Sequence, residues 1–243
     1  MIVATVRALG AALARPGAAC RAIAERPQPL ALAAALLLAV TAVGAATLPR
    51  QLGLLDAALA PGGNMLRDLQ HAAMRAGLMR IVVVDRLVPP PTLVLAALFL
   101  VLACDPMLAA AQDRRRTLWA VAVLGLAPLM VHRAGELAVT YLAAPPAPLV
   151  PGFPIAVPQR FATGALLFWW GEDPVPPWLL AVNARLNLIS GWSVVIWATG
   201  LKRLDRGPAT AWHVGLPVTC VLLAGLVTYW LRGMTTALII GVN

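Results

Sequence analysis

Long apolar stretches, separated by charged or proline-rich segments, make up most of the chain. Each stretch comes close to or exceeds the roughly 20 residues that a helix needs to cross the hydrocarbon core of a bilayer. The stretches are residues 29–48, 92–111, 118–142, 180–201 and 211–231. The pattern therefore predicts an all-α polytopic membrane protein, with a bundle of five transmembrane helices over residues 29–231 and a C-terminal tail over 232–243.

Charged and proline residues set the expected ends of these spans. Pro49-Arg50 is expected to end the first span, and residues 112–116 to form a short turn between the second and third. The fourth span is expected to stop at Lys202-Arg203. Residues 143–181 are too rich in proline for a regular span.

Two segments outside the spans have an apolar stripe at helical spacing. In residues 1–28 the stripe consists of Val3, Val6, Leu9 and Leu13. We expect two short amphipathic helices there, lying on the cytoplasmic surface, with Pro16 in the first turn of the second. Residues 65–80 predict a further amphipathic helix at the membrane interface.

Composition supports a membrane protein and argues against nucleic acid as a partner. Hydrophobic residues make up 60% of the chain and charged residues 12%, and the formal net charge is +9. A soluble domain carries about 25% charged residues. No basic run is longer than residues 114–116, so the positive charge fits membrane-flanking positions better than a phosphate-binding face for DNA or RNA.

The distribution of Lys and Arg predicts the orientation. Residues 114–116 and Lys202-Arg203 lie in the two short connections, where positive charge is most informative about the cytoplasmic side. We therefore expect a cytoplasmic N-terminus and an outside C-terminus in the cell inner membrane. Tryptophans fit belts at the two interfaces: Trp119 and Trp212 on one side, Trp178 and Trp230 on the other.

Four ionisable residues near the outer ends of two spans form the first candidate polar site. His132 and Glu136 share a helix face, and Arg133 lies three residues before Glu136. Arg185 is expected at the same depth, so that Glu136 could pair with Arg133 or with Arg185. The pairing is either an ion or proton site or, as we favour, a structural ion pair near the interface.

Asp105 is a second candidate, because a carboxylate inside a span is costly. It could relay protons. The interpretation that we favour is that the helix ends or kinks at Asp105-Pro106 and the acid meets water or a neighbouring Arg such as Arg114. Asn187, with Ser190 and Ser193, is expected to bond neighbouring helices, with a substrate-binding stripe as the alternative.

Sequence motifs for catalysis, cofactors and metals are missing from the chain. It contains no HExxH, Gly-Lys-Ser/Thr, CxxCH or G-x-S-x-G pattern. Cys20, Cys104 and Cys220 are isolated, as expected of reduced or buried thiols. We therefore expect a protein that is not an enzyme and has no cofactor, metal site or catalytic residue.

Two segments resemble the Yip-domain family of Ypt/Rab-interacting membrane proteins. In the fourth span the resemblance rests on Asn187, Leu188, Ile189, Trp192, Ile196, Gly200 and Leu201, with Asn187 where an acid is usual. Near the N-terminus it rests on Ala14-Arg15-Pro16 and Ala24-Glu25-Arg26-Pro27. It is strongest in residues 13–30 and 183–217, loose in 92–142 and absent from 143–181.

The resemblance implies a function through contacts with other molecules. Eukaryotic members bind Rab-type GTPases and shape transport vesicles, whereas many bacterial members have no assigned role. We expect a non-catalytic scaffold or adaptor that acts through the lipid bilayer and a protein partner, and self-association into a homo-oligomer is left open. The alternative is a small permease or proton-coupled carrier that uses the intramembrane charges.

Overall fold

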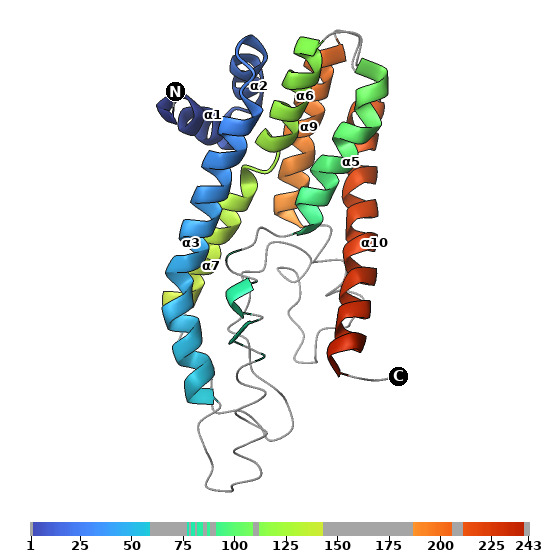
Figure 1. Ribbon diagram of the computed structural model, residues 1–243. Coiled ribbons are helices and arrows are strands. Elements are labelled where there is room, and N and C mark those ends of the chain that lie inside the picture. Colours follow the sequence, from blue (N-terminus) through green and yellow to red (C-terminus); the bar gives the residue numbers. More distant parts are fainter. Residues whose placement is uncertain are drawn as a thin grey trace, which may run out of the picture. The chain divides into compact units, whose positions relative to one another are not determined.

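The computed structural model describes residues 2–58, 91–108, 112–142, 187–205 and 211–240, with isolated positions between 77 and 87. Its regular elements over these residues are α-helices, as the apolar pattern predicts (Figure 1). In chain order they are α1 (Ile2–Ala14), α2 (Pro16–Glu25), α3 (Pro29–Ala58), α5 (Pro91–Leu108), α6 (Gln112–Leu124), α7 (Pro128–Leu142), α9 (Leu188–Asp205) and α10 (Trp212–Ile240).

Three helical segments among the described residues are long and apolar enough to cross a membrane. They are Pro29–Gly53, Asp113–Leu142 and Trp212–Leu231. Thr5–Ala14 and Pro91–Pro106 are shorter apolar helices. The structure therefore has the character of a helical membrane protein, with suitable helices at the predicted first, third and fifth spans.

The chain divides into two compact units. The first unit comprises Met1–Leu37, Pro90–Leu129 and Thr163–Asn243, and the second comprises Leu38–Pro89 and Met130–Ala162. In the first unit, α5 packs against α6 and α10, and α9 packs against α2, α6 and α10. Its core is apolar and includes the fully buried side chains of Leu100, Leu118, Val121, Ile196, Trp197 and Leu201.

The two N-terminal helices follow the sequence prediction. Pro16 occupies the start of α2, where a missing backbone N–H costs nothing because the first turn has no intrahelical acceptor. One face of α2 is buried through Ala19, Cys20 and Ile23, while Arg21 on the other face is exposed. The buried face packs against α9 and α6 in the first unit.

Two prolines that were expected to end or bend helices lie inside helices, so neither ends one. α3 continues through Pro49 to Ala58, so the first helix is longer than predicted. α5 likewise continues through Pro106 to Leu108. In membrane helices such prolines are tolerated where hydroxyl groups and packing satisfy the freed backbone groups.

The segment that contains the predicted third span has a break at residues 125–127, which separates α6 from α7. A continuous α-helix would bond the Leu126 N–H to the Ala122 carbonyl. Instead, Leu126 donates to the Val123 carbonyl at 3.0 Å, and the indole Nε1 of Trp197 on α9 donates to Ala122 at 2.9 Å. Gly125 leaves the space that the indole fills, since a Cβ there would clash with it.

One other prediction, a turn at residues 112–116, was wrong. Residues 112–116 begin α6 and do not form a turn. α9 continues over Lys202-Arg203 to Asp205, where basic residues in a last helical turn are favoured by the helix dipole. α10 reaches Ile240, so most of the predicted tail is helical. The predicted interfacial helix at 65–80 lies largely outside the described residues, and residues 143–186, including Arg185, lie entirely outside them.

Candidate functional site

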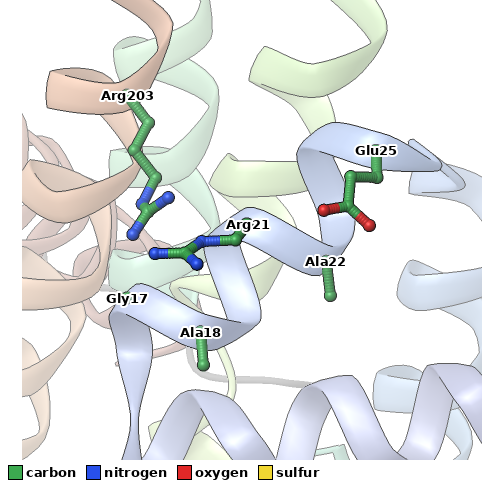
Figure 2. Close-up of a pocket in the computed structure, with 6 residues that line it drawn as sticks. All are labelled: Gly17, Ala18, Arg21, Ala22, Glu25 and Arg203. Atoms are coloured by element: carbon green, nitrogen blue, oxygen red, sulfur yellow. The ribbon is translucent and has the colours of Figure 1, made fainter.

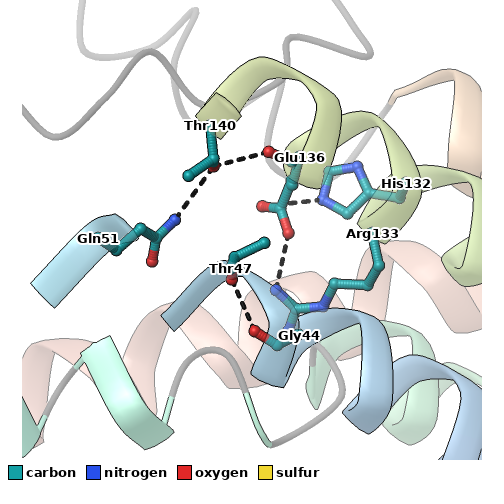
Figure 3. A network of polar contacts seen from close by, with 7 residues as sticks. All are labelled: Gly44, Thr47, Gln51, His132, Arg133, Glu136 and Thr140. Carbon is teal, nitrogen blue, oxygen red and sulfur yellow. Dashed lines mark hydrogen bonds and ion pairs between the residues drawn. The ribbon is translucent and has the colours of Figure 1, made fainter. Parts of the chain in front are cut away.

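His132, Arg133 and Glu136 form one cluster on α7 in the second unit (Figure 3). Arg133 Nη1 donates to Glu136 Oε2 at 2.8 Å, and His132 Nε2 lies 3.6 Å from Glu136 Oε1. The side chains of Arg133 and Glu136 are only 4% and 9% exposed. Positions three and four apart share a helix face, so the sequence predicted the proximity of these three side chains, while the alternative partner Arg185 lies outside the described residues.

Polar groups next to this cluster were not predicted. The Thr140 hydroxyl donates to the Glu136 carbonyl at 2.7 Å, and Gln51 Nε2 on α3 donates to that hydroxyl at 3.5 Å. Both side chains are buried. Figure 3 shows that they continue the polar network from Glu136 to α3. The sequence feature that could have indicated this contact is the presence of Gln51 and Thr140 among apolar residues of their helices.

Asp105 is bound by an arginine that is one position beyond the expected Arg114. Arg115 Nε and Nη2 donate to the two carboxylate oxygens of Asp105 at 2.7 Å and 2.8 Å. The pair joins α5 to α6. The side chain of Asp105 is 32% exposed and that of Arg115 is 55% exposed. This bidentate ion pair is only partly covered by the protein, which fits the structural role favoured for Asp105.

Asn187 caps α9, whereas the sequence analysis assigned it to bonds between helices. Its Oδ1 accepts from the Ser190 backbone N–H at 2.9 Å, and the Ser190 hydroxyl accepts from the Asn187 N–H at 3.0 Å. This reciprocal pair satisfies backbone donors at the helix start, as in a capping box. Ser193 donates to the Ile189 carbonyl within α9 at 3.0 Å.

His213, to which no role was assigned, contacts Asp205. Its Nε2 lies 3.1 Å from Asp205 Oδ2, and its side chain is buried. The contact joins the end of α9 to the start of α10. Sequence spacing alone does not predict it, because the two residues belong to different helices.

A basic pocket lies between α2 and α9 in the first unit (Figure 2). It has a volume of about 450 Å³ and is lined by Gly17, Ala18, Arg21, Ala22, Glu25 and Arg203. Figure 2 shows the guanidinium groups of Arg21 and Arg203 approaching each other across it. No prediction from the sequence included this pocket, because Arg21 and Arg203 are far apart along the chain.

Cys20, which precedes the pocket residue Arg21 on α2, is buried. Its thiol donates to the Ile196 carbonyl at 3.8 Å. Burial raises the pKa of Cys20 to about 11, and the positive charge of Arg203 opposes this shift. The thiol is therefore neutral at physiological pH and packs as a small apolar group.

Together, the fold and these sites define a helical protein with three helices suited to a membrane, a buried ion-pair cluster and a basic pocket. Within the described ranges, no three His, Cys, Asp or Glu side chains are grouped to hold a metal ion. No family model, curated protein or solved structure matches the chain.

Proposed function

We propose that the chain is a non-catalytic integral membrane protein that acts as a scaffold or adaptor, through protein partners or lipids. The main support for this proposal is the ion pair within α7, in which Arg133 Nη1 lies 2.8 Å from Glu136 Oε2. Both groups are buried and belong to one helix. A transport site would present its carboxylate to a substrate or to water, whereas this pair neutralises charge within the protein.

The proposal includes five membrane crossings in the cell inner membrane, with the N-terminus in the cytoplasm and the C-terminus outside. α5 and α9 would be the second and fourth crossings. The resemblance to the Yip-domain family favours this arrangement, because it covers α2 and α9. The positive residues around α6 and at the end of α9 favour the orientation.

A proton-coupled carrier is the alternative function. It is favoured by one observation: His132, Arg133 and Glu136 lie inside Asp113–Leu142, a segment apolar enough to cross a membrane. Intramembrane ionisable residues often mark ion or proton pathways. The two proposals give opposite expectations for variants of Glu136 and Arg133.

If the ion pair is structural, Glu136→Gln should lower the free energy of unfolding by about 3–5 kcal/mol, because Arg133 keeps a buried charge without its counter-charge. Replacing Arg133 by Leu in the same chain should recover much of that loss. Thermal unfolding in mild detergent measures both effects. Glu25→Gln makes the same chemical change at an exposed site and should leave the transition unchanged.

Complementation of a gene deletion distinguishes the two functions. A scaffold should still complement when it carries Arg133→Leu with Glu136→Gln, because the folded protein keeps its outer surfaces. Mass spectrometry after mild-detergent purification should then find the same co-purifying proteins as for the unmodified chain. A stable Glu136→Gln protein with the phenotype of the deletion would refute the structural role and favour the carrier.

A further inference from the structure

The pocket between α2 and α9 combines three features that suit an anion. Two guanidinium groups, from Arg21 on α2 and Arg203 on α9, approach the same space (Figure 2). The first turn of α2, through Gly17 and Ala18, lines the same pocket, and a helix N-terminus carries partial positive charge. The N–H groups of Ala18 and Ala19 already donate to the Arg15 carbonyl, so this turn adds partial positive charge beside the two guanidinium groups.

The two arginines are held close together without an acid between them. Across the part of the chain that the structure describes, the ion pairs are Arg115–Asp105, Arg133–Glu136 and the two His contacts, so neither Arg21 nor Arg203 belongs to one. Glu25 lies one turn after Arg21 on the pocket wall, and Figure 2 shows its carboxylate apart from both guanidinium groups. Like charges that converge in this way repel each other, and a bound anion removes that repulsion.

The shape of the backbone permits this convergence. A Cβ built on Gly17 would lie 3.6 Å from Arg203 Nη2, so the guanidinium packs directly against the start of α2. Planar guanidinium groups with several N–H donors bind phosphate oxygens in pairs. The volume of about 450 Å³ is larger than a single small ion needs and leaves room for attached groups.

In the proposed arrangement, in which α9 crosses the membrane, the pocket lies beside a membrane surface. α2 ends at Glu25, and the first apolar segment suited to a membrane begins soon afterwards at Pro29. Arg203 lies in the last turn of α9, directly after its apolar residues. Phospholipid phosphates lie at this level of a bilayer, and basic pockets beside cytoplasmic helix ends bind anionic head groups.

We propose that Arg21, Arg203 and the first turn of α2 bind a phosphate group, and that its source is an anionic phospholipid. This inference rests on the proposed function, in which the chain acts through lipids or protein partners, and it names the lipid chemistry and the site. The pocket fixes the head group while the acyl chains remain in the bilayer beside the apolar helices.

Native mass spectrometry of the full chain in a neutral detergent tests the site. With phosphatidylglycerol added, the unmodified protein should retain discrete lipid molecules, and more of them than with zwitterionic phosphatidylcholine. Arg21→Gln combined with Arg203→Gln should weaken phosphatidylglycerol retention about tenfold, since hydrogen bonds to charged groups are lost. Gly17→Leu, which fills the pocket without changing the net charge, should weaken it as well.

A matched pair of substitutions controls for overall charge. Arg26→Gln with Lys202→Gln removes two exposed positive charges from the C-cap of α2 and from α9, outside the pocket lining. This pair should retain phosphatidylglycerol like the unmodified protein. Equal weakening in both pairs, or full retention in the Arg21 and Arg203 pair, would overturn the site.

Inorganic phosphate distinguishes the source of the phosphate group. If it displaces phosphatidylglycerol at millimolar concentration and protects the protein equally against heat, the lipid assignment is wrong and the ligand is a soluble phosphate. If the arginine pair instead loses a co-purifying protein while lipid retention is unchanged, the pocket binds an acidic protein surface and the inference fails. If the pocket does not bind lipid but the variants still complement the deletion and co-purify with the same proteins, the lipid site is refuted and the proposed scaffold function is not.

Discussion

At the scale of single residues, the contact between Trp197 and the break after α6 has the most specific geometry. The indole of Trp197 fills the space beside Gly125. Its Nε1 donates to the Ala122 carbonyl, which therefore accepts from the indole where a continuous helix would have the Leu126 N–H. Gly200 on the same helix is similarly close to Val121, because a Cβ there would meet the valine side chain. Small residues thus let α6 and α9 approach closely, as is usual for helices packed in membranes.

Gly125→Ala should therefore destabilise the protein by about 1–3 kcal/mol, the typical cost of overpacking a filled core. Gly191→Ala on α9 is the matched control, because a Cβ there meets nothing within 4 Å. It should stabilise slightly or have no effect, since alanine favours helix. Thermal unfolding of the two variants gives the comparison. Equal stability of both would mean that the indole does not occupy this space in the folded protein.

At the scale of elements, the ends of the helices are determined by groups that the apolar pattern does not reveal. α9 begins where Asn187 and Ser190 exchange side-chain bonds with each other's backbone. α3 and α5 continue through Pro49 and Pro106, respectively, although proline usually marks a helix boundary. Helix existence was therefore predictable here, whereas helix length was not.

Replacing the cap of α9 tests this account. Asn187→Ala should cost about 1 kcal/mol of stability, because a backbone N–H at the start of α9 loses its side-chain acceptor. Asn187→Asp keeps an acceptor and adds a negative charge at the positive end of the helix dipole, so it should be close to neutral. Chemical unfolding in detergent measures both. If Asn187→Asp lowers the stability as much as Asn187→Ala does, Asn187 does not stabilise the protein by capping α9.

At the scale of the whole molecule, the five-span arrangement gives a clear expectation for surface labelling. A cysteine at Lys202, which is exposed on α9, should resist a membrane-impermeant maleimide in sealed cells, and one at Gln159 should react. Native Cys20, Cys104 and Cys220 are all buried, so background labelling should be low. Opening the cells should make the cysteine at position 202 reactive. Labelling there in sealed cells would contradict a cytoplasmic N-terminus with five crossings.

The sequence by itself determined the properties that depend on near neighbours in the chain. Apolar length predicted a helical membrane protein, and helical spacing predicted α1, α2 and Arg133 as one of two possible partners of Glu136. These follow because residues three or four apart meet on any helix, whatever surrounds it. The chemical function does not follow from such local patterns.

Only the tertiary structure decided the features that join distant segments. The break after α6 depends on Trp197 of α9, and the basic pocket depends on the approach of Arg203 to Arg21. His213 meets Asp205 for the same reason, since each contact needs two helices to pack in one register. An apolar pattern tells which residues avoid water but not which helix faces which, because many packings bury the same surface. The residues that line the basic pocket are therefore set by packing.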